Sequence, residues 1–376
     1  MPQRRARRRR ARRRILSSPR SRRSIPTRCR RAKRSRRSTR SKSRRRRTAD
    51  VHTPLAALVF LACLAAAGTA RAQSYPARTI TLTVTAAAGG VTDVVARALG
   101  QRLAEAWGQQ VVIENKGGAA HVVGAQSVAK AAPDGYSLLV AEAGTFTINP
   151  TLYGKGKLPY DEETDFIPIT GIVRINQALL GHPSLPPGSV RELIALAKER
   201  PGDLTYGTAG IGSAPHMNMV LFERMAGVKL QGVHYRGAAP ALTDVMAGHV
   251  QLMSVSVSLA LPALRAGQVK VFGIGSSRRL AGAADIPTVA ESGLPGYEAS
   301  TWFGLFATAG TPRAIVDKIN AEVANILADS QFREKFLAPQ MFEPMASTPE
   351  AFADHIRAQT RKWAEVIRAQ KLTIEK

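Results

Sequence analysis

Apolar residues along this chain follow two spacings, one typical of strands and the other typical of helices. β-Branched runs such as Thr79–Thr85 are typical of strands, whereas apolar residues recur at helical spacing over Asp93–Trp107. Further strands are predicted at Val111–Ile113, Ser137–Ala141, Leu204–Gly207, Val228–Tyr235, Val250–Val257 and Val269–Ile274. Further helices are predicted at Val123–Ala132, Ser189–Glu199, His216–Met225, Pro240–Ala247, Ser258–Ala266, Pro312–Ala328 and Pro349–Ala369. This alternation predicts an α/β fold with mostly parallel sheets.

Two short glycine-rich turns each join a predicted strand to a predicted helix. The first turn is Ala86–Asp93 and the second is Gly207–Ser213. A helix N-terminus carries unpaired N–H groups and partial positive charge, so it binds anions well. Glycine also lets a ligand approach the backbone closely. Two such turns, about 120 residues apart in the chain, predict two lobes that face one anionic ligand.

The candidate ligand-binding residues lie in these turns and after the strand Ser137–Ala141, because ligands of open α/β sheets bind at the carboxyl ends of strands. They are Ala88, Gly89, Gly90, Thr92, Asp93, Gly144, Thr145, Thr208, Ala209, Gly210, Gly212, Ser213 and His216. Asp93 would repel a carboxylate that faced it. It suits a helix cap equally well, or it would accept a bond from a ligand amine or hold a water. Ser213 also suits an N-cap, and His216 a structural hydrogen bond.

Positive charge is concentrated at the N-terminus of the chain. Residues 1–50 hold 25 of the 54 Lys and Arg residues, whereas the sequence from Gln73 onward is nearly neutral. The Arg- and Ser-rich stretch 1–47 is unable to bury a core, so we expect it to be disordered. Two interpretations stay open. The stretch is either a nucleic-acid-binding arm or the result of a start codon assigned too far upstream, which the following sequence favours.

An export signal is predicted at residues 48–72. Basic residues precede the apolar stretch Leu55–Ala67, and the small-x-small motif Ala70–Ala72 follows it. Basic, apolar and small-residue regions in this order define a secretory signal. The apolar stretch of 13 residues is short for a membrane span, which needs about 20. We therefore expect export and cleavage after Ala72.

The sequence after Ala72 lacks the common signatures of phosphate-binding enzymes, hydrolases and metal sites. It contains no Gly-x-x-x-x-Gly-Lys-Ser/Thr run, no Gly-x-Gly-x-x-Gly fingerprint at either turn, no Gly-x-Ser-x-Gly elbow and no paired-His motif. Cys29 and Cys63 both precede the cleavage site, which excludes disulfides and cysteine nucleophiles from the mature chain. Spacing alone leaves a Ser/His/Asp triad open. We expect no enzymatic activity, no cofactor and no metal.

Short motifs follow one another in a specific order over Tyr75–Ile367. They are Tyr75-Pro76, Ala87–Gly90 with Thr92-Asp93 and Ala96-Arg97, Glu114-Asn115, Ala132–Tyr136, Tyr206–Gly212 with His216, Tyr235–Gly237 with Pro240–Asp244, Pro287–Glu291, Trp302–Gly304 and Gly310–Pro312. Each motif alone is unspecific, but the ordered set is highly specific. In this set the chain resembles the periplasmic solute receptors of tripartite tricarboxylate transporters, often called Bug-type receptors.

The resemblance implies a two-lobed periplasmic binding protein of type II, in which each lobe is a sheet flanked by helices and the chain crosses between lobes twice. Lobe 1 would comprise residues 75–175 and 298–376, and lobe 2 residues 176–297. A monomer would capture a small organic carboxylate through backbone N–H groups, hydroxyls and ordered water, and hand it to membrane permease subunits, with no nucleic acid partner. The alternatives are a ligand sensor without a dedicated permease, or an enzyme that uses the anion site of the glycine turns.

Four positions depart from the pattern of the family that the chain resembles. After Asn115 the family has a proline and a Gly-Ala-Gly-Gly stretch, where this chain has a segment that contains His121. His234, Gln251 and Gly275 stand where the family has proline, aspartate and threonine. These substitutions bear on the pocket, so the resemblance leaves the carboxylate unidentified.

Overall fold

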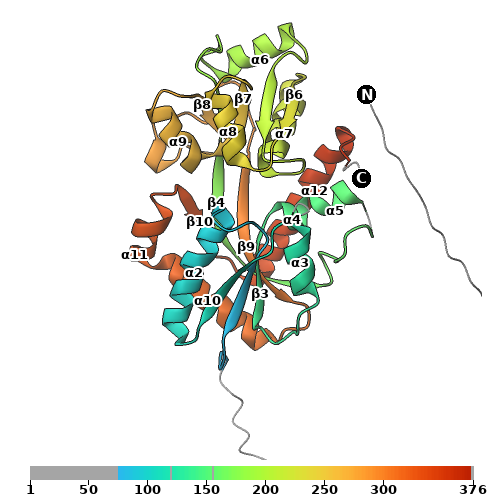
Figure 1. Ribbon diagram of the computed structural model, residues 1–376, viewed down its shortest axis with the longest axis vertical. Coiled ribbons are helices and arrows are strands. Elements are labelled where there is room, and N and C mark those ends of the chain that lie inside the picture. The colour runs from blue at the N-terminus through green and yellow to red at the C-terminus, as the bar shows by residue number, and fades with distance from the viewer. Residues whose placement is uncertain (1–74, 119–120, 155, 374–376) are drawn as a thin grey trace, which may run out of the picture. The chain divides into compact units, whose positions relative to one another are not determined.

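The computed structural model describes residues 75–118, 121–154 and 156–373. The predicted basic extension and export signal lie outside the described residues. The described part contains two groups of parallel strands, which two long antiparallel strands, β4 (Phe166–Gly181) and β9 (Ser300–Thr308), connect (Figure 1). No helix in these ranges is both long enough and apolar enough to span a bilayer.

The first group of strands is built around β1 (Ile80–Val84). It pairs in parallel with β2 (Val111–Asn115) on one side and with β3 (Ser137–Glu142) on the other. Because side chains alternate along a strand, Leu138 and Val140 face the core formed with α2 (Val91–Trp107) and α10 (Arg313–Ala328). Leu139 and Ala141 face the opposite core, which contains α3 (Val122–Ala129) and the first part of α12 (Pro349–Ala369). Helices therefore cover both faces of this first group of strands.

The second group repeats this arrangement around β5 (Thr205–Thr208), which pairs in parallel with β6 (Gln231–His234) and β7 (Leu252–Ser256). β8 (Lys270–Ile274) lies antiparallel to β4. The core on one face includes residues of α6 (Val190–Glu199) and α7 (Ala214–Ala226), and the core on the other includes residues of α8 (Ala238–Met246) and α9 (Val257–Arg265). The α/β fold of two lobes, each a sheet flanked by helices, is thus confirmed.

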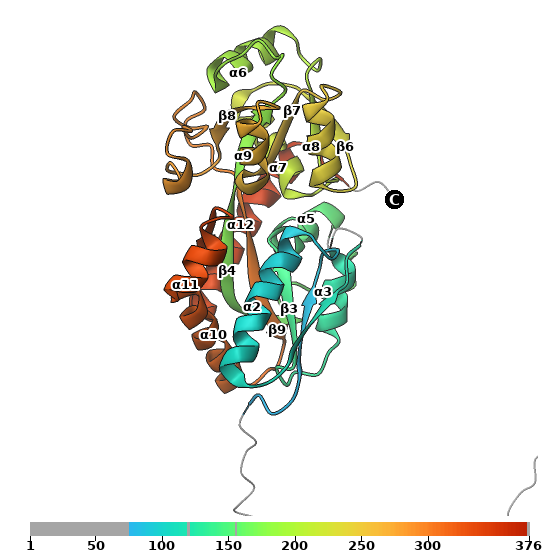
Figure 2. The same ribbon diagram turned by 60° about the vertical axis from the view of Figure 1, so that its left-hand side comes forward.

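β4 belongs to both groups. Its first part, Phe166–Asn176, pairs with β9, and its last part, Gln177–Gly181, pairs with β7 and β8. Figure 2 shows β4 and β9 running together from one group of elements to the other. Among the described strands, the five pairs that involve β4 or β9 are antiparallel and the other four are parallel. The expectation of mostly parallel sheets is therefore wrong for the middle of the molecule.

The C-terminal helix α12 packs against both groups. Phe352 near its start is buried beneath the first sheet, whereas Trp363, Val366 and Ile367 near its end belong to the core that also contains α7. The Thr348 side chain caps this helix by accepting a hydrogen bond from the backbone of the first turn. The remaining elements are α4 (Gly144–Thr147), α5 (Asn149–Tyr153), η1 (Ala281–Ala283), α11 (Ser330–Phe332), η2 (Arg333–Leu337) and β10 (Phe342–Pro344).

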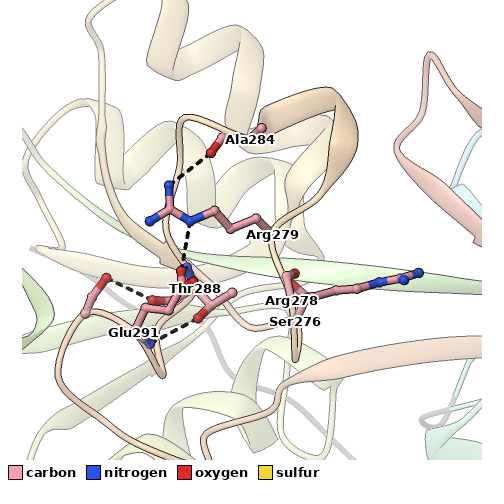
Figure 3. Close-up of polar contacts among 7 residues, drawn as sticks. Ser276, Arg278, Arg279, Ala284, Thr288 and Glu291 are labelled. Atoms are coloured by element: carbon pink, nitrogen blue, oxygen red, sulfur yellow. Dashed lines mark hydrogen bonds and ion pairs between the residues drawn. The ribbon is translucent and has the colours of Figure 1, made fainter.

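The segment between β8 and β9 is held together by a polar network around Glu291 (Figure 3). Glu291 Oε2 accepts hydrogen bonds from Arg279 Nε (3.0 Å) and from the backbone of Thr288 (2.8 Å). The backbone of Glu291 donates in return to Thr288 Oγ1 (3.0 Å), and Arg279 also donates to the Ala284 carbonyl (3.1 Å). The motif Pro287–Glu291 therefore has a structural role: Thr288 and Glu291 each accept a hydrogen bond from the backbone of the other, which stabilises this long connection.

Candidate functional site

The first glycine turn is braced from inside by Asp93. Its Oδ2 accepts hydrogen bonds from Gly89 N (2.8 Å) and Arg97 Nε (2.9 Å), and its Oδ1 accepts one from Asn115 Nδ2 (2.9 Å). Burial opposes ionisation of this carboxyl, but the bonds from Arg97, Gly89 and Asn115 outweigh it and lower the pKa of Asp93 below its usual value. Gly90, not Asp93, is the N-cap residue of α2.

Sequence reasoning missed Arg97 and Asn115 as parts of this site. The i, i+4 spacing of Asp93 and Arg97 was the available signal, since residues at that spacing are neighbours on a helix. Asn115 is the last residue of β2, beside the end of β1, so its contact with Asp93 depends on strand pairing.

Asp93→Asn is expected to lower the free energy of unfolding by about 2 kcal/mol at pH 7, because it replaces charged hydrogen bonds of a buried carboxylate. The folded pKa of Asp93 is lowered, so this stabilisation is present above the unfolded pKa of about 4 and is lost as pH falls through the folded pKa. Urea unfolding at pH 7 and at pH 3 measures the effect. A gap between the two proteins that is equally wide at both pH values would contradict the assignment.

The brace leaves several backbone N–H groups of the first turn without an acceptor. Gly89 N donates to Asp93, and Gly90 N donates to the Ala87 carbonyl (3.2 Å). Within the described ranges, the N–H groups of Ala88 and Thr92 make no hydrogen bond. Thr92 is the second residue of α2 and is buried. These N–H groups lie at the positive end of a 17-residue helix.

The second glycine turn has its own internal bonds. Ser213 Oγ donates to the Gly210 carbonyl (2.7 Å) and accepts from His216 N (3.4 Å), so Ser213 is the N-cap of α7. His216 Nδ1 accepts from Gly212 N (3.1 Å). The structural roles that the sequence left open for Ser213 and His216 are therefore both present. The described residues provide no acceptor for the N–H of Ala209.

Two histidine rings lie against each other at the second turn. The ring centroids of His216 and His234 are 5.0 Å apart, and Thr208 Oγ1 lies 2.8 Å from His234 Nδ1. Burial, with a smaller contribution from His234, lowers the pKa of His216 to about 4. His216 is therefore neutral at pH 7, and because its Nδ1 accepts a bond, its Nε2 carries the proton. Burial also lowers the pKa of His234.

Gly144 approaches the second turn from the first group of strands. A Cβ atom on Gly144 would lie 3.7 Å from the Gly212 carbonyl oxygen, and one on Gly212 would lie 2.7 Å from Leu152 Cδ2. Thr145 follows Gly144 in α4 and is fully buried, and its Oγ1 has no hydrogen-bond partner among the described residues. The structure thus brings Gly144 to Gly212, although they are distant in the sequence.

His121 joins the ends of two strands beside the first turn. Its Nδ1 lies 2.9 Å from the Thr85 carbonyl oxygen at the end of β1, and its Nε2 lies 3.3 Å from Glu142 Oε2 at the end of β3. Burial lowers the pKa of His121, but the hydrogen bond and charge of Glu142 and the bond to Thr85 outweigh this, so the net pKa is raised. His121 has a φ of 76°, which is uncommon for a residue other than glycine.

The other two departures from the family pattern have structural roles. Gln251 Oε1 accepts from Thr205 N (2.6 Å) and Thr205 Oγ1 (2.7 Å) at the start of β5, the strand end opposite the second turn. A Cβ atom on Gly275 would lie 2.6 Å from the Ala299 carbonyl oxygen, so two segments pack closely there. Among the described residues, neither forms a hydrogen bond with a residue of the two turns.

Metal-binding side chains do not cluster in the described ranges: no three His, Cys, Asp or Glu residues are placed to hold an ion. A broad groove between α5 and α12, of about 1130 Å³, is lined by none of the turn residues. The two turns therefore offer backbone N–H groups, hydroxyls and neutral imidazole, which are donors suited to an anion.

Comparison with known proteins gives consistent matches. Residues 95–372 match the family model of the tripartite tricarboxylate transporter family receptor. The chain is 32% identical over 313 residues to protein BugT of Bordetella pertussis (strain Tohama I), covering 82% of this chain and 94% of that protein. A solved structure of R. palustris Rpa4515 with adipate has a TM-score of 0.73 and 34% identity. This match covers 80% of this chain and 100% of the Rpa4515 chain. The structure of MatC from Rhodopseudomonas palustris with bound malate has a TM-score of 0.69 and 34% identity. This match covers 78% of this chain and 100% of the MatC chain.

Proposed function

The chain belongs to the tripartite tricarboxylate transporter receptor family, and on that premise we propose that it captures a small organic dicarboxylate between its two glycine turns. Proteins of this family are periplasmic solute-binding receptors. The observation that carries the proposal is that, among the described residues, both turns keep backbone N–H groups without a hydrogen-bond partner, at Ala88 and Thr92 in the first and at Ala209 in the second. Unpaired N–H groups at helix N-termini hold carboxylates well.

Two such turns suit a ligand with a negative group at each end. One carboxylate would accept bonds from the first turn at the N-terminus of α2, and the other from the second turn at the N-terminus of α7. The relatives Rpa4515 and MatC have structures with adipate and with malate, and both compounds are dicarboxylates. The site would comprise the thirteen candidate residues, with Asp93 and Ser213 shaping the turns while their neighbours contact the ligand.

The two lobes of this proposal are residues 75–175 with 298–376, and residues 176–297. The change of β4 partners between Asn176 and Gln177 supports this division. Closure would bend β4 and β9 together, in the manner of hinge motions around ligands. We further infer export with cleavage after Ala72, a monomer that passes its ligand to permease subunits, and no catalysis.

Ligand-dependent unfolding tests this function directly. Adipate or malate, added in large excess over its Kd to protein freed of retained ligand, is expected to raise the Tm by several degrees, because a ligand that binds only the folded state stabilises it. The dimethyl esters are matched controls, since they keep the carbon skeleton without the charges. Mass spectrometry of material released from the denatured protein identifies the natural ligand. No shift with any carboxylate, or consumption of the added compound, would refute the proposal.

A further inference from the structure

Two acidic side chains lie next to the first glycine turn. Asp93 lies inside the turn, and Glu142 is the last residue of β3, which pairs with β1 directly before the turn. Two residues after Glu142, Gly144 approaches the Gly212 carbonyl of the second turn. Glu142 therefore lies between the first turn and the place where the first lobe meets the second turn. A carboxylate at such a position is a natural partner for a ligand ammonium group.

Both of these acids already have partners within the protein. Asp93 accepts three hydrogen bonds, from Gly89, Arg97 and Asn115. Glu142 faces His121 at 3.3 Å and lies 3.5 Å from Thr301 Oγ1. The second turn and the first three residues of α7, residues 207–216 together, contain no Asp or Glu.

His121 is positioned to be a cation. Its two ring nitrogens face two oxygens that only accept hydrogen bonds, the Thr85 carbonyl oxygen and the Glu142 carboxylate. A neutral imidazole donates through one nitrogen only, so it would turn a lone pair toward one of these oxygens. The imidazolium form satisfies both contacts. His121 keeps a positive φ to reach them, and such strain persists only where the surrounding structure holds it.

We propose that His121 makes the ligand site selective for carboxylates without an amine, because it neutralises the Glu142 carboxylate that would otherwise bind a ligand ammonium group. The inference rests on the proposed function and specifies the ligand class for that same site. An amino acid would bring its ammonium group to a face on which Asp93 and Glu142 are both already paired. A plain dicarboxylate would meet N–H donors and a neutral ion pair.

Pairs of ligands that differ only by the amine test this proposal. Calorimetric titration at pH 7.5 is expected to give a Kd for succinate at least tenfold lower than for aspartate, and the same order for glutarate and glutamate. His121→Asn removes the cation while asparagine tolerates the left-handed backbone. In this variant the succinate Kd is expected to rise and the aspartate Kd to fall, so that the preference disappears.

The double variant His121→Asn/Glu142→Gln separates charge from structure. It lacks both members of the pair, so the free carboxylate is gone and the preference for succinate over aspartate is expected to return. Equal or tighter binding of the amino acids by the unmodified protein would overturn this inference and leave the proposed function standing. So would a His121→Asn variant that keeps the full preference. Failure of these four ligands and of adipate and malate to bind would instead overturn the proposed function and this inference with it.

Discussion

Gly89→Val is expected to weaken dicarboxylate binding at least a hundredfold, which corresponds to about 2.8 kcal/mol of binding free energy. Gly89 has a φ of +81°, where a β-branched residue is strongly disfavoured. The strain, of about 1–2 kcal/mol, is relieved when the turn changes its backbone angles. That change moves Gly89 N away from Asp93 and displaces the neighbouring N–H of Ala88 from its place in the proposed site.

Gly108→Val is the matched control for this change. Gly108 ends α2, the helix that the first turn begins, and it has a φ of +62°. A Cβ atom at either glycine would meet nothing within 4 Å, so strain is the common effect of both substitutions. Both variants are expected to lose similar stability to urea, but only Gly89→Val loses affinity in calorimetric titration. Unchanged affinity in Gly89→Val, or an equal loss in Gly108→Val, would remove the first turn from the site.

Gly304→Ala is expected to lower the free energy of unfolding by about 3 kcal/mol. A Cβ atom on Gly304 of β9 would overlap Phe352 Cζ and lie 2.8 Å from Phe352 Cε1. The Phe352 ring is fully buried on α12, with ring centroids of Trp302 and Phe306 at 5.1 and 5.5 Å. The ring is therefore unable to move without disturbing its neighbours, and overpacking of this kind typically costs about 1–3 kcal/mol or more.

A smaller side chain at position 352 is expected to rescue much of this loss. Phe352→Leu leaves space for the new methyl group. The loss of unfolding free energy in Gly304→Ala/Phe352→Leu should therefore be smaller than the sum of the losses in the two single variants, by at least about 1 kcal/mol. Urea unfolding of the four proteins completes the cycle. Strictly additive losses would show that the clash with Phe352 is not the cause.

Local elements of the fold were predictable from the sequence, because their patterns are local. The helix predicted over Pro349–Ala369 has these bounds in the structure, and the one predicted over Asp93–Trp107 begins two residues earlier, at Val91. β4 was not predicted as one strand. Its residues are buried almost throughout, polar Asn176 and Gln177 included, so they show no simple alternation, and its two parts pair with different strands. Its antiparallel partner β9 lies more than a hundred residues away, beyond what periodicity indicates.

The positions of the two turns were predictable, but the bonding of their atoms was not. A glycine-rich segment between a strand and a helix indicates a turn with free N–H groups. Which of these groups stay free depends on side chains from other elements, as the contact of Asn115 with Asp93 illustrates. His121 stood out only as a departure from a family pattern. Its partner Glu142 comes from a neighbouring strand, and pairing across strands is not visible in sequence spacing.

The shared strand β4 has a mechanical consequence for this receptor. A hinge made of free loops swings about single bonds with little resistance, but here β4 and β9 are bonded to each other from Phe166 to Asn176. Such a pair of strands deforms by twisting over many residues. It would therefore store elastic energy on closure and return to its open form when the ligand leaves. In the proposed closure, the stiffness of this pair of strands would set how far the lobes separate and how much of the ligand's binding free energy goes into drawing them together.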